Sequence, residues 1–328
     1  MIITRTPFRV SLFGGGTDHP WWFNDNGGLV VGMAIDKYGY ISCRNMPQYF
    51  DYKTRLSYSK IETVKNNEEI EHKAINSILK CYSIESGLEI SYVSDIPAKT
   101  GIGSSSSFVV GLINALHTLF YKSTTKADLA TQAIFIEQQV LKENVGCQDQ
   151  IWAAYGGLNS IRFNKKIKNS FSVSPIILSD DFEKKLLDSL VLIYTESERI
   201  SSNISGQYLT PTSKKENELK SILEIAEESV EYFREESIQK IGRLLHKTWE
   251  IKRNMHQVVS NTKIDDIYNK AISLGAFGGK LLGAGGGGFL LIMAEGKAMQ
   301  NIREQFKYQI QVPIRIDYEG SKLLYFER

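Results

Sequence analysis

Polar and apolar residues alternate near the N-terminus, and this pattern predicts that the chain begins as β-sheet. Residues 2–13 form one strand-like run. Residues 29–44, rich in Val, Ile and Tyr, predict two strands with a break near Asp36 and Lys37. Further strands are expected at residues 88–92 and 191–194, and on both sides of a glycine cluster at residues 283–288.

Elsewhere apolar residues recur at helical spacing. Ile70, Ala74, Ile75 and Ile78 lie on one side of a helix expected over residues 68–82. Further helices are expected at residues 126–142, 219–233, 238–259 and 265–274, the second of them with a Glu/Lys-rich outer face. Since helices and strands are mixed without regular βαβ alternation, the sequence predicts an α+β fold.

Length and charge limit the class of protein. The 328 residues are enough for two domains that share a cleft, and we place these at residues 1–180 and 181–328. The 39 basic and 37 acidic residues leave a net charge of +2 with no basic stripe, so nucleic acid is not an expected partner. A small anionic substrate is compatible with this balance.

Cysteine usage and hydropathy indicate the compartment. The three cysteines are odd in number and lack C-x-x-C spacing, which favours neither a disulfide framework nor a structural zinc site. We therefore expect a reducing, cytoplasmic location. No signal-peptide pattern occurs at the N-terminus, and the apolar run at residues 289–294 is too short to span a bilayer, so no membrane partner is expected. The pattern does not specify an oligomeric state.

The most informative segment is a loop of small residues at positions 101–107, which leads into an apolar stretch from Phe108. Backbone N–H groups at a helix start stabilise an anion without basic side chains. Gly101 and Gly103 would let the backbone approach phosphate oxygens, while serine hydroxyls can cap the helix, donate hydrogen bonds or bind Mg²⁺. This combination suggests ATP; the alternative is an ordinary serine-capped buried helix.

Two more glycine segments accompany this loop. Near the N-terminus a strand ends in three glycines followed by Thr17, Asp18 and His19, a turn in which Asp18 can accept hydrogen bonds from sugar hydroxyls. A plain strand-to-loop turn would look the same. In the third segment every residue from 283 to 288 except Ala284 is glycine, which indicates close approach to another chain segment or to a ligand.

Two common nucleotide signatures are absent from the sequence. Lys280 and Lys297 each follow a glycine, but Leu281 and Ala298 stand where a Walker motif requires Ser or Thr. Residues 283–288 match G-x-G-x-x-G formally, yet they lead into a strand, whereas a dinucleotide fingerprint opens a helix.

In their order, the three segments resemble the three motifs of the GHMP kinases, the superfamily of galactokinase, homoserine kinase, mevalonate kinase and phosphomevalonate kinase. The resemblance covers nearly the whole chain. In residues 5–20, 146–150 and 279–289 it is greatest to members that act on a heptose 7-phosphate. It implies a two-domain GHMP kinase fold, with an N-terminal ribosomal protein S5 domain 2-like part, a C-terminal ferredoxin-like part and the active site between them. ATP, Mg²⁺ and a phosphorylated sugar are the ligands it implies.

Site residues follow from the same resemblance. Asp149 matches the catalytic aspartate and Arg9 the basic residue beside it; because phosphoryl transfer relies on alignment and charge stabilisation, their positioning should matter more than basicity. Ser105 and Glu137 match the Mg²⁺ ligands, although a lone helical glutamate is usually a surface residue. The residues implied at the ATP phosphates are Lys99, Gly101, Ile102, Gly103, Ser104, Ser105, Ser106 and Ser107. Those implied at the acceptor are Gly15, Gly16, Thr17, Asp18, His19 and Gly285.

One departure from the family pattern bears on the acceptor. Galactokinases typically have Gly-Glu-His-Thr-Asp-Tyr where this chain has glycine at positions 14–16, then Thr17, Asp18 and His19, so two side chains are replaced by hydrogens. The wider site favours a larger sugar, such as a heptose with a terminal phosphate, over galactose; fucose-type sugars remain open.

The expected reaction is phosphorylation of the anomeric hydroxyl of D-glycero-D-manno-heptose 7-phosphate, for nucleotide-activated heptose synthesis. Alternatives are a C1 kinase of fucose or an unphosphorylated heptose, a catalytically silent sensor of ATP and sugar, and a structural protein with glycine-rich turns. The Ser/Thr/Asn-rich residues 196–215 are a candidate lid. Unranked candidates for binding the 7-phosphate are Lys37, Arg44, Arg162 and Arg199.

Overall fold

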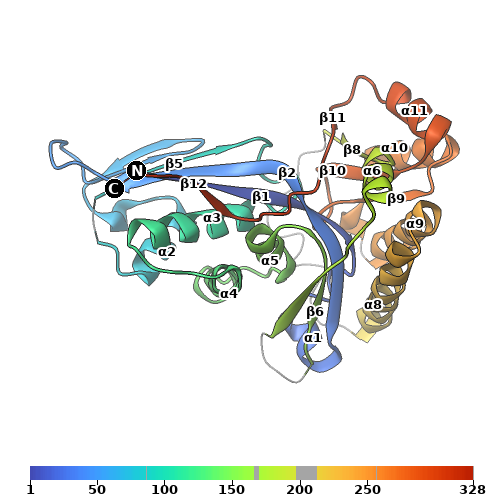
Figure 1. Cartoon of the computed structure of the whole chain (residues 1–328), viewed down its shortest axis with the longest axis horizontal. Coiled ribbons are helices and arrows are strands. Elements are labelled where there is room, and N and C mark those ends of the chain that lie inside the picture. Colours follow the sequence, from blue (N-terminus) through green and yellow to red (C-terminus); the bar gives the residue numbers. More distant parts are fainter. Residues whose placement is uncertain (86, 166–169, 197–212, 256, 328) are drawn as a thin grey trace.

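The computed structural model describes the chain except for residues 86, 166–169, 197–212, 256 and 328. Within the described part, one sheet has eight strands and a second has four, and helices cover both (Figure 1). This mixture confirms the predicted α+β class. The expected lid at residues 196–215 lies almost wholly outside the described residues.

The larger sheet carries the N-terminal half of the chain. Its strands are β1 (Ile2–Phe13), β2 (Gly28–Asn45), β3 (Thr54–Ser57), β4 (Ile61–Val64), β5 (Leu88–Ser94), β6 (Leu158–Phe163), β7 (Phe171–Pro175) and β12 (Lys322–Phe326). The order is β12-β1-β2-β5-β3-β4, with β6 paired to β2 and β7 to β6. The two long strands β1 and β2 are neighbours in the interior of this sheet and extend toward the second one (Figure 1).

Helices cover the lower face of this sheet in Figure 1. They are α2 (Lys73–Cys81), α3 (Ser104–Leu119), α4 (Lys126–Phe135), which continues as a π-helical turn over Ile136–Val140, and α5 (Gln148–Tyr155). The short helix α1 (Pro20–Asn26) follows β1, and a 3₁₀ turn, Asn67–Glu69, precedes α2. From Ser106 to His117, α3 is buried, so it forms the central layer between sheet and outer helices.

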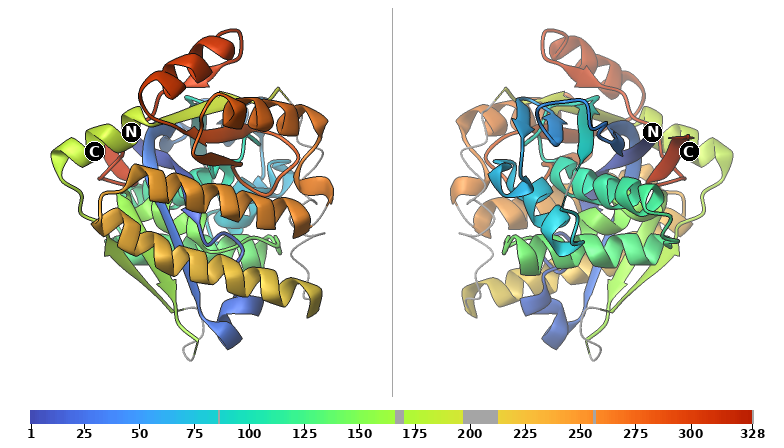
Figure 2. Two further views of the ribbon diagram at one scale, coloured as in Figure 1. Left: turned by 90° about the vertical axis from the view of Figure 1, so that its right-hand side faces the viewer. Right: turned by 90° about the vertical axis from the view of Figure 1, so that its left-hand side faces the viewer.

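The smaller sheet has the order β11-β8-β10-β9, from β8 (Leu190–Tyr194), β9 (Gly278–Leu281), β10 (Phe289–Met293) and β11 (Gln311–Val312). Its helices are α6 (Asp180–Asp188), α8 (Ser213–Arg234), α9 (Ile238–Met255), α10 (Thr262–Ser273) and α11 (Gly296–Gln305), with a 3₁₀ turn at Gln257–Val259. In Figure 2 the helices α8 and α9 run side by side across this end of the molecule. Among the described helices, none is long and apolar enough to cross a membrane.

A shared hydrophobic core joins the two sheets. Phe8 and Phe13 of β1 pack in one cluster with Phe233 of α8, Leu245 of α9 and Leu291 of β10. All five side chains are at most 3% exposed. Burial of large aromatic and aliphatic side chains is the dominant favourable term in folding, so this cluster also anchors β1 to the second sheet.

Some predicted boundaries needed correction. Residues 29–44 belong to one strand, not two, but the ladder between β1 and β2 shifts register where Asp36 and Lys37 were expected to break it. The helix expected at residues 68–82 begins only at Lys73, because the 3₁₀ turn precedes it. The expected strand at residues 2–13 is confirmed.

The C-terminal strand β12 was not predicted. It pairs antiparallel with β1 in the larger sheet, with Ile2 opposite Phe326, although the strands that precede it in the chain, β8 to β11, build the smaller one. The N-terminal ammonium of Met1 donates to the Glu327 carbonyl at 2.9 Å, which holds the two ends together. The division at residue 180 stays a prediction.

Candidate active site

The phosphate-loop candidate, residues 99–107, ends at the start of α3. Gly103 is the N-cap, with a φ of 76°, and Gly101 has a φ of 87°. Among the residues that the structure describes, no side chain caps this helix. The N–H groups of its first turn therefore have no intrahelical acceptor and carry the positive end of the helix dipole, as an anion site requires.

The four serines of the loop point in different directions. Ser104 is half-buried and Ser105 exposed, whereas Ser106 and Ser107 are buried. Ser107 donates its hydroxyl to the Thr6 carbonyl at 3.1 Å, so it ties α3 to β1. Of the four hydroxyls, those of Ser104 and Ser105 are the accessible ones.

Two further residues of the loop also differ in environment. The Ile102 side chain lies in the core, and its carbonyl accepts from the Arg9 amide at 3.0 Å. Lys99 is exposed, with a φ of 65°. Within this loop, any contribution of Ile102 to phosphate binding would come from its backbone.

Arg9 and Asp149 form the centre of the site. Arg9 donates from Nε to Asp149 Oδ1 at 2.7 Å and from Nη2 to Oδ2 at 2.6 Å, and Nη1 donates to the Gly101 carbonyl at 2.5 Å. One guanidinium thus links β1, the phosphate loop and the first turn of α5. The bidentate geometry fixes the carboxylate plane, while the Asp149 side chain keeps 23% of its surface exposed.

Glycine at position 103 is required by this arrangement. A Cβ there would lie 3.1 Å from Arg9 Cγ and 3.3 Å from Asp149 Oδ2, and the positive φ would be strained for other residues. The phosphate loop therefore touches the ion pair directly. The structure brings together Arg9, Asp149 and residues 101–103, which the sequence could only associate through a resemblance.

Glu137 is buried behind the loop, only 1% exposed. Both carboxylate oxygens accept from Ser106 Oγ, at 3.0 and 2.9 Å, and Gln150 Nε2 donates to Oε2. Burial raises the pKa of Glu137 to about 8, against the opposing effect of these hydrogen bonds. The sequence predicted Glu137 and Ser105 as partners at a metal ion. In the structure the hydrogen bonds to Glu137 come instead from the adjacent Ser106.

The acceptor turn is defined here as residues 14–19. Thr17 and Asp18 hold it from inside: Thr17 Oγ1 donates to the Gly14 carbonyl at 2.8 Å, and Asp18 accepts from the Gly16 amide at 2.9 Å. Both residues are fully buried. At Gly15 a Cβ would make ordinary van der Waals contacts, at 3.7 Å, with Gln148 Nε2 and Ser11 Oγ.

His19 ends this turn and precedes α1. It is 4% exposed, and among the described residues its Nδ1 has no hydrogen-bond partner. Burial lowers the pKa of His19, while the neighbouring carboxylates of Asp18 and Asp149 oppose the shift. A buried imidazole with an unpaired nitrogen beside Asp149 is the kind of polar group that a ligand hydroxyl would satisfy.

The third glycine segment packs against the phosphate loop. A Cβ at Gly288 would lie 2.3 Å from the Thr100 carbonyl, and one at Gly101 would lie 2.4 Å from the Leu282 carbonyl. Gly285 lies against the Val259 backbone, where a Cβ would approach Cα to 2.8 Å. The predicted close approach is therefore to other chain segments, and Gly285 sits against the second domain's own 3₁₀ turn.

The sequence analysis missed the two lysines that accompany this segment. Lys280 of β9 donates to the Leu12 carbonyl at 2.9 Å, and Lys252 of α9 donates to the Gly283 carbonyl at 2.6 Å. Both are at most 9% exposed. A lysine inside the short buried strand before the glycine cluster was the available signal, but we used Lys280 only to exclude a Walker motif.

The proposed 7-phosphate ligands lie in ion pairs or outside the described residues. Arg162 pairs with both oxygens of Glu227 at 2.7 and 2.8 Å, Arg44 pairs with Glu89 at 2.6 Å, and Lys37 pairs with Asp36 at 2.9 Å. Arg199 lies outside the described residues. None of these contacts joins a cation to the acceptor turn.

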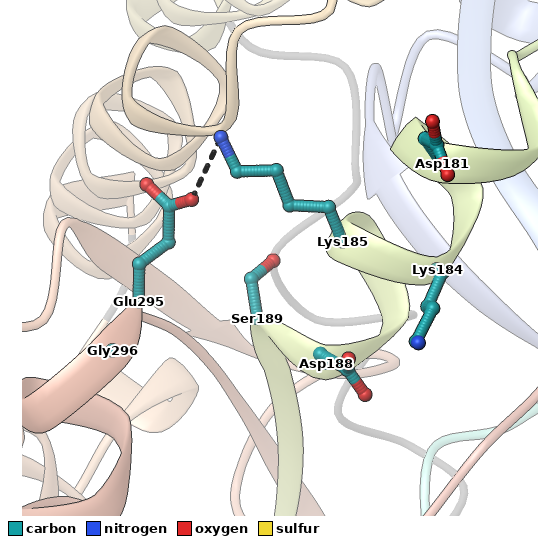
Figure 3. A pocket seen from close by; sticks show the side chains of 7 residues that line it. All are labelled: Asp181, Lys184, Lys185, Asp188, Ser189, Glu295 and Gly296. Carbon is teal, nitrogen blue, oxygen red and sulfur yellow. Dashed lines mark ion pairs between the residues drawn. The ribbon is translucent and has the colours of Figure 1, made fainter.

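A surface pocket of about 300 Å³ lies elsewhere, between α6 and the start of α11 (Figure 3). It is lined by Asp181, Lys184, Lys185, Asp188, Ser189, Glu295 and Gly296. Lys185 and Glu295 form an ion pair across it at 3.1 Å, so its charges largely compensate one another. It includes none of the predicted site residues.

The uncapped start of α3 lies directly beside an arginine-oriented carboxylate, an arrangement that is compatible with a phosphotransferase. Comparison with known proteins agrees. Residues 67–157 match the model for the GHMP kinases N terminal domain, and residues 229–310 match that for GHMP kinases C terminal. The chain belongs to the GHMP kinases and is an enzyme that transfers a phosphoryl group to an alcohol, as the sequence predicted.

Individual relatives extend over nearly the whole chain. It is 29% identical over 318 residues to D-glycero-alpha-D-manno-heptose 7-phosphate kinase of Campylobacter jejuni, covering 92% of this chain and 91% of that one. It is 26% identical to galactokinase of Pyrococcus furiosus, covering 90% and 89%. A crystal structure of a D-glycero-D-manno-heptose 1-phosphate kinase from Bacteroides thetaiotaomicron superposes with a TM-score of 0.81 at 20% identity, covering both chains fully.

The buried Glu137 makes a prediction about stability and pH. Its pKa of about 8 in the folded protein lies above the ordinary value of 4.5, so only the folded state keeps the proton between these values. This stabilisation is fully present below the unfolded pKa and is lost as the pH rises through the folded pKa. As the pH rises from about 5 to about 8.5, the free energy of unfolding of the wild type should therefore fall by on the order of a few kcal/mol relative to that of Glu137→Gln, which has no carboxyl group at this position to ionise.

Denaturant titrations at the two pH values measure this difference. Glu224→Gln, at an exposed position in α8, is the control and should follow the wild-type pH dependence. Parallel curves for Glu137→Gln and wild type would mean that Glu137 is already ionised in the folded protein.

Proposed function

We propose that the chain is an ATP- and Mg²⁺-dependent sugar kinase that phosphorylates the anomeric hydroxyl of D-glycero-D-manno-heptose 7-phosphate. The product would be the 1,7-bisphosphate, for nucleotide-activated heptose synthesis. The observation that carries the proposal is the contact of the Arg9–Asp149 pair with the phosphate loop at Gly101 and Gly103. This contact supports a role for Asp149 next to the γ-phosphate, because the oriented carboxylate lies against the proposed phosphate loop.

The choice of sugar rests on similarity and on space in the acceptor turn. The Campylobacter jejuni relative is named as a heptose 7-phosphate kinase, whereas the Bacteroides structure is titled a heptose 1-phosphate kinase. We favour the 7-phosphate because the first relative is the more similar in sequence. The glycines at positions 15 and 16, which stand where galactokinases carry two side chains, also support a sugar larger than galactose.

In the proposed reaction Asp149 orients the acceptor hydroxyl. Its carboxylate, fixed by Arg9, accepts the hydrogen bond from the sugar O1–H. As the bond from O1 to the γ-phosphorus forms and the bond from that phosphorus to the β,γ-bridging oxygen breaks, the hydroxyl proton passes to Asp149 and ADP leaves. The first-turn N–H groups of α3 stabilise the negative charge on the transferred group.

The oxygen donors of the site suit Mg²⁺. Ser105 offers an exposed hydroxyl at the start of α3, and Glu137 offers a carboxylate behind it. Within the described residues, no group of three or more His, Cys, Asp and Glu side chains is arranged to hold a metal alone. Mg²⁺ commonly relies on one or two protein oxygens together with substrate phosphates and water, so this donor set is compatible. When bound, the ion would neutralise charge on the phosphates.

Asp149→Asn tests the role of the carboxylate. The amide keeps the shape but cannot take the proton, so kcat should fall by about 10³-fold or more. ATP binding, measured as a thermal shift, should remain. The matched control is Glu227→Gln, which changes another carboxylate that accepts hydrogen bonds from both terminal nitrogens of an arginine side chain. This variant should retain wild-type turnover. Wild-type turnover in Asp149→Asn would remove the residue from the mechanism.

Serine variants test the Mg²⁺ assignment. Ser105→Ala should raise the Mg²⁺ concentration for half-maximal rate several-fold, while Ser104→Ala, its half-buried neighbour, should not. A shift in Ser106→Ala alone would assign the role to the serine that contacts Glu137. Unchanged titrations in both Ser105→Ala and Ser106→Ala would reject a serine ligand.

A panel of acceptors tests the substrate. Candidates are D-glycero-D-manno-heptose with phosphate at C7, at C1 or absent, together with fucose and galactose, and ADP release is the measurement. The 7-phosphate should exceed the others in kcat/KM by at least about tenfold, since a phosphate offers charged hydrogen bonds that the free sugar lacks. Preference for an unphosphorylated sugar would favour a different C1 kinase, and no ADP with any sugar would favour a silent sensor.

A further inference from the structure

Lys280 makes a hydrogen bond between the two sheets. It lies on β9, at the end of the smaller sheet, where it is paired with Leu291 of β10. Its side chain leaves that sheet, and Nζ donates at 2.9 Å to the carbonyl of Leu12 in β1, in the larger sheet. The contact joins residues 268 positions apart in the chain.

The carbonyl that Lys280 binds lies at an irregular point of β1. The ladder between β1 and β2 passes from Ser11 opposite Gly32 to Phe13 opposite Val31, so Leu12 is skipped. A bulge of this kind leaves a backbone group without its ladder partner and bends the strand, and a buried carbonyl without a partner is costly. Lys280 donates to the Leu12 carbonyl at this irregular point.

The bulge lies between the catalytic pair and the acceptor turn. Arg9, three residues before Leu12, contacts Asp149, and the acceptor turn begins two residues after Leu12 at Gly14. The direction in which β1 leaves the bulge is therefore one determinant of where Gly15 and Gly16 lie relative to Asp149. The other is Asp18, whose carbonyl accepts from the Cys147 amide at 3.0 Å and whose Oδ2 accepts from the Gln148 amide at 3.3 Å. The hydrogen bond from Lys280, in the smaller sheet, reaches β1 at this bulge.

Burying a lysine side chain to donate this hydrogen bond is energetically unfavourable. Lys280 is 3% exposed, and burial lowers its pKa well below the ordinary value, reinforced by the nearby Lys252 and Arg9 and opposed by Asp18. Packing alone would be served better by an apolar side chain of similar volume. Either protonation state keeps N–H donors for Leu12, so the hydrogen bond does not depend on charge.

We propose that Lys280 is a positioning residue of the acceptor site: from the second sheet it holds the bulge at Leu12 and thereby sets the acceptor turn against Asp149. It acts through β1. The expected consequence of its loss is weaker acceptor binding, because the turn would no longer be held in the productive geometry, whereas the phosphate loop keeps its own contacts with Arg9.

Lys252 is a matched control. It also donates from a buried ammonium to a backbone carbonyl, but its partner Gly283 belongs to the glycine segment that packs on the phosphate loop. Loss of the Lys252 bond should therefore disturb the nucleotide side of the site. Comparison of Lys280→Met with Lys252→Met separates the acceptor turn from a general effect of removing a buried lysine.

The first measurement is hydrogen–deuterium exchange without ligands. In Lys280→Met, amides of residues 12–19 should exchange at least about tenfold faster than in wild type, while those of α3 stay protected. Lys252→Met should instead raise exchange at residues 283–288. Wild-type exchange at residues 12–19 in folded Lys280→Met would overturn the proposal, as would a uniform increase over the whole chain, which would indicate a structural role only.

The second measurement is kinetic and rests on the proposed function. With whichever acceptor of the panel the wild type phosphorylates, Lys280→Met should raise the acceptor KM about tenfold and change the KM for ATP less than about twofold. Lys280→Arg, which keeps a donor, should recover part of the loss and serves if the methionine variant does not fold. A fall in kcat with both KM values unchanged would contradict positioning. Failure of the heptose assignment leaves the exchange result unaffected.

Discussion

The contact of Arg9 with both Asp149 and the Gly101 carbonyl is the interaction on which the active site depends. One buried guanidinium joins three segments that lie far apart in the sequence: the middle of β1, the loop before α3 and the first turn of α5. A planar fork of donors is suited to this, because it fixes the carboxylate through two parallel bonds and still has a donor for the loop. Without Arg9, no shared hydrogen-bond donor would fix the phosphate loop and Asp149 relative to each other.

Close backbone packing supports this centre. Glycine at 103 lets the loop touch the ion pair, and glycines at 101 and 288 let the loop and the third glycine segment approach each other to distances that a Cβ would forbid. The core that contains Phe8, Phe13 and Phe233 anchors β1 to both sheets. Catalysis by alignment needs such rigidity, since a displacement of about 1 Å can cost two orders of magnitude in rate.

The buried polar groups divide between structure and chemistry. Hydrogen bonds to the chain itself are made by Thr17, Asp18 and Ser107, and they hold the turn and the helix. The family resemblance, in contrast, implies that these residues bind ligands. His19 differs because its Nδ1, near Asp149, has no hydrogen-bond partner within the described part of the chain. Glu137 is tied to Ser106 and Gln150, so its interaction with a metal would require these bonds to rearrange.

The sequence by itself determined the α+β class, the family, the strands β1, β2, β5, β8, β9 and β10 and several of the helices, because hydrophobic periodicity and glycine-rich turns are local properties of the chain. It did not predict that residues 29–44 form one bulged strand, that β12 returns to the first sheet, or that Ser106 rather than Ser105 contacts Glu137. Each of these depends on which segments meet in space. The direction of a helical serine differs by about 100° from one position to the next, so only the packing of α3 decides which hydroxyl faces Glu137. For the same reason Lys280 became recognisable as a contact between the two sheets only when both were in place.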